Sequence, residues 1–172
     1  YKTGLIDGLT TNPTLIRKSG RKHEDVYQEF KDIGVTDLSM EVIGNGVDIV
    51  ENSRIKKLIK NIKFIKRIYS THEIKKSKYI KNKVNFFAKR FAAKEAFVKS
   101  IGSGFRSGIN FSDIIILNNK LGKPYIRVNN KIKSIICKKN KLRNFKVFLS
   151  LSDEAKHSIA YVILSRSKKW KK

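Results

Sequence analysis

One long helical pattern, rich in Ala and Phe, reads Phe86-Phe-Ala-Lys-Arg-Phe-Ala-Ala-Lys-Glu-Ala-Phe-Val-Lys-Ser100. Its spacing predicts a helix from about residue 82 to residue 101, ended by the glycine at position 102. Apolar side chains on it can line a buried stripe: Phe87, Phe91 and Val98. The helix is therefore expected to be the central element of the domain.

An acidic residue stands out in this apolar helix. Glu95 and Lys99 are one turn apart and share a face, which alone is typical of a solvated ion pair. Asp48 changes this interpretation because it stands inside an otherwise apolar strand pattern, residues 43–50. Carboxylates are costly to bury unpaired. Either lysines neutralise them, or both bind a hard cation such as Mg²⁺, which leaves its other positions to water and phosphate.

The segments on either side of the helix predict an α+β domain. Alternating or apolar runs indicate strands at residues 43–50, 114–117, 124–128, 146–150 and 158–164. Helical spacing indicates helices at residues 52–63 and 131–139, and Ser70-Thr71 is the expected start of a short one. A glycine-rich turn, Gly102 to Gly108, follows the central helix and could let backbone amides approach a ligand.

Charge is distributed unevenly along the 172 residues. The chain carries 39 Lys and Arg against 14 Asp and Glu, a formal net charge of +25. Residues 1–41 have a net charge of −1, and residues 42–172 have +26. Such a surface could bind nucleic acid nonspecifically, and this class of binding module is the alternative to an enzyme. Because 30 of the cations are Lys and only nine are Arg, phosphate or base readout is less favoured, and no specific nucleic acid is expected.

Composition also excludes several other classes. No apolar run is long enough to cross a membrane, so we expect a cytoplasmic protein without a membrane partner. One cysteine excludes an intramolecular disulfide framework. Together with three scattered histidines, it also excludes the usual zinc arrangements.

Four ordered motifs resemble one family. They are Gly46-Val-Asp-Ile-Val50 with Arg54, Phe91-Ala-Ala-Lys-Glu-Ala-Phe-Val-Lys99 with Gly102-Ser-Gly104, Gly122-Lys-Pro124, and Leu149-Ser-Leu-Ser-Asp-Glu154. Residues 43–165 are thereby similar to the holo-acyl-carrier-protein synthases, the small bacterial phosphopantetheinyl transferases. The resemblance implies the 4′-phosphopantetheinyl transferase fold, a small antiparallel sheet packed on a long helix, for a domain at residues 43–172.

The same resemblance implies the reaction and its site. It is the Mg²⁺-dependent transfer of 4′-phosphopantetheine from coenzyme A to a serine of apo-acyl carrier protein, in fatty acid biosynthesis. By correspondence with the family, Asp48 and Glu95 bind the metal, Lys99 lies beside the phosphates, and Glu95 deprotonates the serine. Coenzyme A is expected near a set of basic, glycine and proline residues: Lys89, Arg90, Lys99, Gly102, Gly104, Lys123 and Pro124.

The family also implies partners. Its members are typically homotrimers with active sites at the subunit junctions, and basic residues at the start of the first helix dock the acyl carrier protein. Arg54 and Lys57 occupy that position here, with a solvated surface as the alternative. Many relatives have Ser-His where this chain has Ser152-Asp153, but others carry Asp-Glu there as this chain does, so the absence of the histidine is expected to be tolerated.

The segment before the domain has a different resemblance. Asp7-Gly-Leu-Thr-Thr-Asn-Pro-Thr-Leu15 resembles the early βα units of the transaldolases, which fold as (β/α)₈ barrels and form a Schiff base on a lysine. A barrel needs eight strands, and only about 41 residues are covered. We therefore expect residues 1–42 to be a non-functional fragment, with an aldolase-type activity as the least favoured alternative.

Overall fold

The computed structural model describes residues 8–9, 25, 28, 37–38, 42–102 and 104–167. The chain divides into two compact units, Tyr1–Glu41 and Val42–Lys172. In the first unit, β1 (Gly8–Leu9) pairs in parallel with β2 (Asp37–Leu38). The Thr-Thr-Asn-Pro motif at residues 10–13 lies outside the described residues, so the transaldolase-like fragment stays a prediction.

The second unit is built on a three-stranded antiparallel sheet. Its strands are β3 (Val42–Glu51), β6 (Phe145–Asp153) and β7 (His157–Arg166), in the order β3-β7-β6. A separate antiparallel pair is formed by β4 (Ile114–Asn118) and β5 (Pro124–Val128). All five strands expected from the sequence are present in this unit, and four of them extend beyond the expected bounds.

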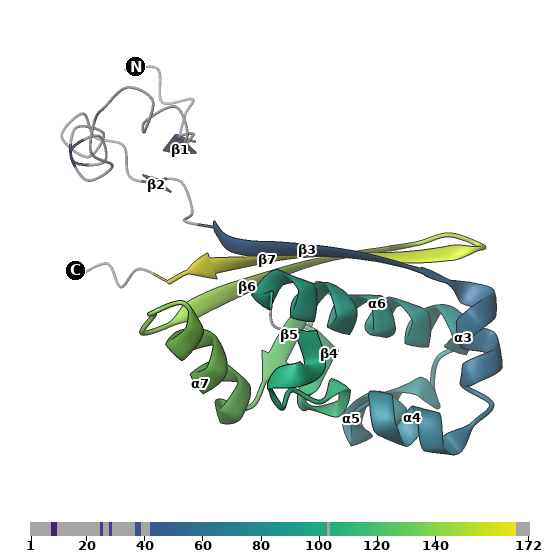
Figure 1. Cartoon of the computed structure of the whole chain (residues 1–172). Helices are drawn as coiled ribbons and strands as arrows, with labels where there is room; N and C mark the ends of the chain where they lie inside the picture. The colour runs from purple at the N-terminus through teal and green to yellow at the C-terminus, as the bar shows by residue number, and fades with distance from the viewer. Residues whose placement is uncertain are drawn as a thin grey trace. The chain divides into compact units, whose positions relative to one another are not determined.

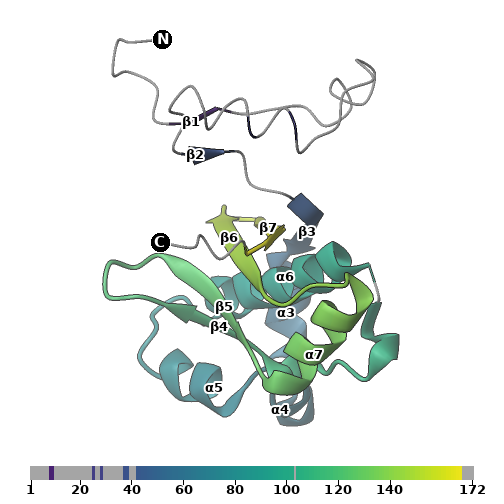
Figure 2. The same ribbon diagram turned by 90° about the vertical axis from the view of Figure 1, so that its left-hand side faces the viewer.

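The long helix α6 (Lys83–Ile101) lies across the sheet. Asn82 caps its start by accepting a hydrogen bond from the backbone N–H of Asn85, and Gly102 ends it in the left-handed region at φ 65°. Figure 1 shows α6 running under β3 and β7, with the smaller elements on its other side. Figure 2 shows the same layers from the side, with α7 (Asn130–Lys139) in front of the helix and β4 and β5 beside it. The prediction of a small antiparallel sheet on a long helix is confirmed.

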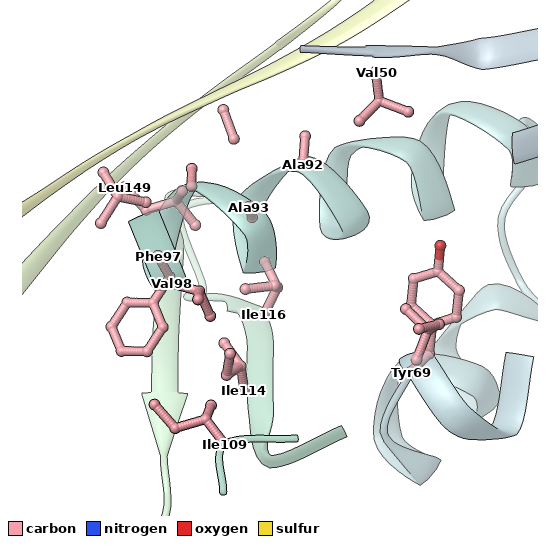
Figure 3. Packing of buried hydrophobic residues seen from close by; sticks show 14 of the residues in the cluster. Val50, Tyr69, Ala92, Ala93, Phe97, Val98, Ile109, Ile114, Ile116 and Leu149 are labelled. Atoms are coloured by element: carbon pink, nitrogen blue, oxygen red, sulfur yellow. The ribbon is translucent and has the colours of Figure 1, made fainter. Parts of the chain in front are cut away.

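The buried side chains of α6 lie on more sides of the helix than the single stripe that the sequence predicts. Phe87 and Val98 are buried as expected, but Phe91 is only half-buried and stacks on Phe111. Four alanines of the helix are fully buried: Ala88, Ala92, Ala93 and Ala96. Figure 3 shows Ala92, Ala93 and Phe97 among side chains from the sheet, from β4 and from the loop before it. A helix with neighbours on nearly all sides loses the one-sided pattern of a surface helix.

The prediction of one helix at residues 52–63 is wrong. The structure has α3 (Asn52–Leu58) and α4 (Ile62–Ile68), separated at Asn61. The side chain of Asn61 accepts hydrogen bonds from the backbone N–H groups of Lys63 and Phe64, so it begins a new helix. The expected short helix follows as α5 (Thr71–Ser77), and two 3₁₀ turns, η1 (Gly104–Ser107) and η2 (Phe111–Asp113), precede β4.

No helix among the described residues is both long enough and apolar enough to cross a membrane.

Candidate active site

Two glycines bring β3 into direct contact with α6. A Cβ on Gly46 would overlap the carbonyl oxygen of Ala96, and one on Gly44 would overlap the carbonyl oxygen of Ser100. Only glycine leaves room for the helix backbone at these positions. The side chains next to the glycines are therefore held close to the second half of α6.

Asp48 lies two residues beyond Gly46, so strand alternation turns it to the same face. Lys99 Nζ donates to Asp48 Oδ1 at 2.8 Å and to the carbonyl oxygen of Val47 at 3.1 Å. The side chain of Asp48 is 14% exposed and that of Lys99 is 54% exposed. The lysine thus pairs across two elements, and the solvated pair within the helix is not what the structure shows.

Glu95 is half-buried and lies in the field of Asp48. Burial raises the pKa of Glu95 above its usual range, and the charge of Asp48 raises it further. Lys99 and Arg54 act in the opposite direction on the same pKa. Two carboxylates that repel each other gain from a cation placed between them. The structure therefore brings together Asp48, Glu95 and Lys99, with Arg54 near enough to influence them.

A pocket of about 440 Å³ lies along the first half of the same helix. Three cations line it: Lys76, Lys89 and Arg90. The turn before β5 adds Gly122 and Pro124. A hollow lined by several cations and by apolar side chains is suited to an anionic ligand that also has an apolar part.

Arg90 is the most buried cation of this pocket, at 5% exposure. It donates to the carbonyl oxygen of Phe86 at 3.1 Å and to Asn118 Oδ1 at 3.2 Å, and it lies 3.5 Å from the centre of the Phe86 ring. Its Nε is buried without a hydrogen-bond partner among the described residues. Burial lowers the pKa of Arg90 to about 10, and the charge of Glu73 opposes this. The guanidinium is therefore held between Phe86 and Asn118, and its positive charge lies at the wall of the pocket.

Comparison with known proteins shows the family of the chain. Residues 44–162 match the model of the 4′-phosphopantetheinyl transferase superfamily. A holo-[acyl-carrier-protein] synthase of Pelagibacter ubique is 57% identical over 127 residues, which cover 74% of this chain and 99% of the relative. The chain belongs to the holo-[acyl-carrier-protein] synthase family.

Solved structures of holo-[acyl-carrier-protein] synthases have the same fold. The enzyme of Neisseria meningitidis is 35% identical with a TM-score of 0.65, over 73% of this chain and 99% of that one. The enzyme of Bacillus anthracis, solved in complex with CoA (3′,5′-ADP), is 33% identical with a TM-score of 0.62, over 75% of this chain and all of that one. The expected 4′-phosphopantetheinyl transferase fold is confirmed.

Asp153 also lines the cationic pocket. Lys89 Nζ donates to its Oδ1 at 2.6 Å and Asn85 Nδ2 donates to its Oδ2 at 2.8 Å. Burial alone would raise the pKa of Asp153, but the hydrogen bonds from Lys89 and Asn85 outweigh burial and hold it below its usual range. Asp153 is therefore the counter-ion of Lys89 in this structure.

This ion pair predicts a pH-dependent contribution to stability. A carboxyl group with a lowered pKa stabilises the folded state above its unfolded pKa, and the stabilisation is lost as the pH falls below about 4. Asp153→Asn should therefore be less stable than wild type at pH 7, by a margin that shrinks as the pH falls through the lowered pKa. Urea unfolding of both proteins at pH 7 and pH 3 tests this, and a margin as large at pH 3 as at pH 7 would contradict it.

The other residues expected at the coenzyme A site are placed differently. Gly102 and Gly104 have φ of 65° and 59° and shape the turn after α6. Lys123 lines a second pocket, of about 530 Å³, against β6 and β7, and does not line the pocket of Lys89 and Arg90. Pro124 lines both. This chain thus divides the expected coenzyme A residues between two surfaces.

The residues expected to dock the carrier protein lie on α3. Arg54 and Lys57 are both exposed. Arg54 also acts on the pKa of Glu95, which places its charge near the site. A carrier protein held by Arg54 would therefore lie close to the carboxylates.

Sequence reasoning missed a buried ion pair next to the site. Lys94 and Glu73 have fully buried side chains, with Lys94 Nζ 2.9 Å from Glu73 Oε2. The segment Ser70-Thr-His-Glu73 has the pattern of a capping box, which the structure contains, so part of this cluster could have been predicted. Burial of Lys94 had no such signal, because lysine in a helix normally indicates a solvent-facing position.

Proposed function

We propose that this chain transfers the 4′-phosphopantetheine group of coenzyme A to a serine of apo-acyl carrier protein and releases adenosine 3′,5′-bisphosphate. The observation that carries the proposal is the arrangement along α6. Lys89 and Arg90 line a cationic pocket, and Glu95 and Lys99 meet Asp48 one to three turns further along. A nucleotide in the pocket would have its diphosphate within reach of the carboxylates.

Glu95 is the group that accepts the proton of the attacking serine hydroxyl. Its carboxylate is half-buried on the face of α6 that meets Asp48, where the hydroxyl would approach the diphosphate. As the proton leaves, the serine oxygen bonds to the phosphorus that carries pantetheine. The bond from this phosphorus to the bridging oxygen breaks, and the nucleotide leaves with the electron pair. Lys99, more than half exposed, supplies positive charge beside the diphosphate.

Asp48 and Glu95 are the residues that would hold Mg²⁺. Their donor set fits the ion, because Mg²⁺ is commonly bound by one or two carboxylates together with water and substrate phosphates. No larger group of metal-binding side chains occurs in the part of the chain that the structure describes. When bound, the ion would neutralise charge on the diphosphate and the leaving group.

Lys89 and Arg90 bind the 3′-phosphate and adenine end of coenzyme A in this proposal. Lys89→Met should raise the KM for coenzyme A about tenfold, the loss of one charge-assisted contact. The KM for 3′-dephospho-coenzyme A should change little, because it lacks the phosphate. Steady-state kinetics with both substrates test this, with Lys133→Met on the exposed side of α7 as the control. An equal rise for both substrates would place the 3′-phosphate elsewhere.

A homotrimer would cover the outer face of the sheet. Five large apolar side chains are exposed there: Val47, Ile49, Phe148, Ile159 and Tyr161. Such a contiguous apolar surface is typical of an interface. The pocket that contains Lys123 lies on this side, because Phe148 and Tyr161 also line it. A neighbouring subunit would then bring its Lys123 and Pro124 to the junction, completing a site that one chain divides between two surfaces.

The trimer predicts a linked loss of assembly and activity. Ile159→Lys puts a charge in the middle of the outer face, which should prevent association. Analytical ultracentrifugation should show a trimer for wild type and a monomer for the variant, with transfer reduced in parallel. A variant that is monomeric and fully active would contradict an interfacial site.

The remaining assignments follow from the family. The exposed Arg54 and Lys57 dock the acidic surface of the carrier protein, and the reaction belongs to fatty acid biosynthesis in the cytoplasm. The whole activity lies in residues 43–172, since the match to the Pelagibacter relative covers 99% of that protein. Residues 1–42 contribute nothing to catalysis.

Release of adenosine 3′,5′-bisphosphate tests the reaction from the donor side. Chromatography should detect it in equal amount to the modified carrier protein, and only when coenzyme A, Mg²⁺ and apo-acyl carrier protein are all present. Release without a carrier protein would indicate hydrolysis of coenzyme A, and no release would exclude the proposed transfer.

A further inference from the structure

Lys94 joins α6 to three other parts of the domain. Its ammonium group donates to the carbonyl oxygen of Ile68 at 2.8 Å, to Glu73 Oε2 at 2.9 Å and to the carbonyl oxygen of Phe111 at 3.0 Å. An ammonium has three donors, so all of them are used. The acceptors come from the end of α4, from α5 and from η2. One side chain thus ties the middle of α6 to the layer on the far side of the helix from the sheet.

Glu73 also accepts hydrogen bonds from groups outside α6. Its Oε2 also accepts from the N–H of Ser70 at 2.8 Å and from Ser70 Oγ at 2.7 Å. Its Oε1 accepts from the N–H of Ile116 in β4 at 3.3 Å. Both carboxylate oxygens are therefore held by donors whose positions are set by α5 and β4.

At its alanine positions, packing gives α6 little resistance to rotation, although the helix also buries the large side chains of Phe86, Phe87 and Phe97. Four of its positions that face other elements are alanines with no exposed surface. Alanine allows close approach, but it has no side chain long enough to interlock with the neighbouring element. Directional hydrogen bonds can supply the missing constraint, because they fail when the helix turns. A buried ion pair often adds little stability over an apolar pair of the same size, so its use here favours a role in orientation.

We propose that Lys94 and Glu73 are positioning residues for the transfer reaction, whose ion pair fixes the rotation of α6 so that Glu95 and Lys99 face Asp48. Successive residues of an α-helix differ in direction by about 100°. With Lys94 held on one side, Glu95 is directed toward β3 and α3. This inference rests on the roles proposed above for Asp48, Glu95 and Lys99.

The first half of α6 has anchors of its own. Arg90 is bonded to Phe86 and Asn118, and Lys89 is bonded to Asp153. Loss of the Lys94–Glu73 pair should therefore disturb the reacting groups more than the coenzyme A pocket. The kinetic result expected is a lower kcat with a nearly unchanged KM for coenzyme A.

The deciding variant is the full-length double substitution Lys94→Met with Glu73→Gln. It keeps the volume of both side chains and leaves no unpaired buried charge, so the protein should fold, with a stability lowered by the loss of the donor to the carbonyl oxygens of Ile68 and Phe111. Its kcat should fall tenfold to about a hundredfold, as for reacting groups displaced by roughly 1 Å. The KM for coenzyme A should stay within about twofold, as expected when only interactions of the transition state are lost.

The control separates orientation from stability. Ile132→Ala removes a fully buried side chain of α7 and should destabilise the protein without changing kcat. If Ile132→Ala lowers kcat as much as the double variant does, the effect is one of stability and the inference is wrong. A folded double variant with wild-type kcat would also overturn it.

If the double variant does not fold, the single substitution Glu73→Gln tests whether the Lys94–Glu73 pair positions the reacting groups. Both carboxylate oxygens of Glu73 are surrounded by hydrogen-bond donors. The NH₂ group of glutamine would therefore face another donor and weaken the contact between α5 and α6, while the side-chain volume is kept. A several-fold lower kcat at constant KM supports the inference, and an unchanged kcat overturns it. If wild type itself transfers nothing to the carrier protein, the proposed function fails and this inference fails with it.

Discussion

Glu95→Gln should lower the rate of transfer by about 10²–10⁴-fold, the usual contribution of a general base. Glutamine has nearly the same shape, so the chain should fold normally. It cannot accept the serine proton and offers a metal only a neutral amide oxygen. We therefore also expect more Mg²⁺ to be needed for half-maximal rate. Single-turnover transfer at saturating coenzyme A, measured across Mg²⁺ concentrations, gives both effects.

Glu154→Gln is the matched control for this result. Glu154 is exposed at the turn between β6 and β7, and the substitution changes charge by the same amount. Its rate should stay near that of wild type. Equal losses in the two variants would show that overall charge matters and that Glu95 has no specific role, whereas full activity of Glu95→Gln would exclude it as the base.

Gly46→Ala should destabilise the domain by about 3 kcal/mol or more, at or above the upper end of the usual cost of overpacking. The new methyl group would overlap the backbone of α6 at Ala96, and a backbone cannot move aside as a flexible side chain can. The strand must shift away from the helix and would carry Asp48 with it. Transfer should therefore fall even in the fraction of protein that remains folded.

Gly122→Ala separates this effect from the general cost of replacing glycine. Gly122 has φ of 82°, but a Cβ there would meet no atom within 4 Å. Only the left-handed backbone is penalised, at about 1–2 kcal/mol. Urea unfolding should give a clearly larger loss for Gly46→Ala than for Gly122→Ala. Equal losses would mean that the contact between β3 and α6 is not tight.

Most of the fold could be predicted because its signals are local. The alternation in β3, the Ala-rich helix ended by Gly102 and the turn before Pro124 are all readable within a few residues. The break between α3 and α4 was missed because the isoleucines at positions 55, 59 and 62 keep helical spacing across it, and only Asn61 signals a new N-cap. Periodicity shows which faces are apolar, but it does not show where a helix is interrupted.

The site could be predicted only where two distant signals agreed. Asp48 and Glu95 were each unusual in an apolar element, and this common feature suggested that they meet. The pairing of Lys99 with Asp48 spans 51 positions and follows from the contact of β3 with α6, which the sequence does not show. Buried Lys94 was missed because its partners are mostly backbone carbonyl groups, which no residue pattern reveals.

The most direct test is the intact mass of an apo-acyl carrier protein after incubation with this chain, coenzyme A and Mg²⁺. We predict an increase by the mass of one phosphopantetheine group, lost when the acceptor serine is replaced by alanine and strongly slowed in Glu95→Gln. An unchanged mass with the wild-type chain, or an equal rate of increase with Glu95→Gln, would contradict the proposed reaction and the role of Glu95.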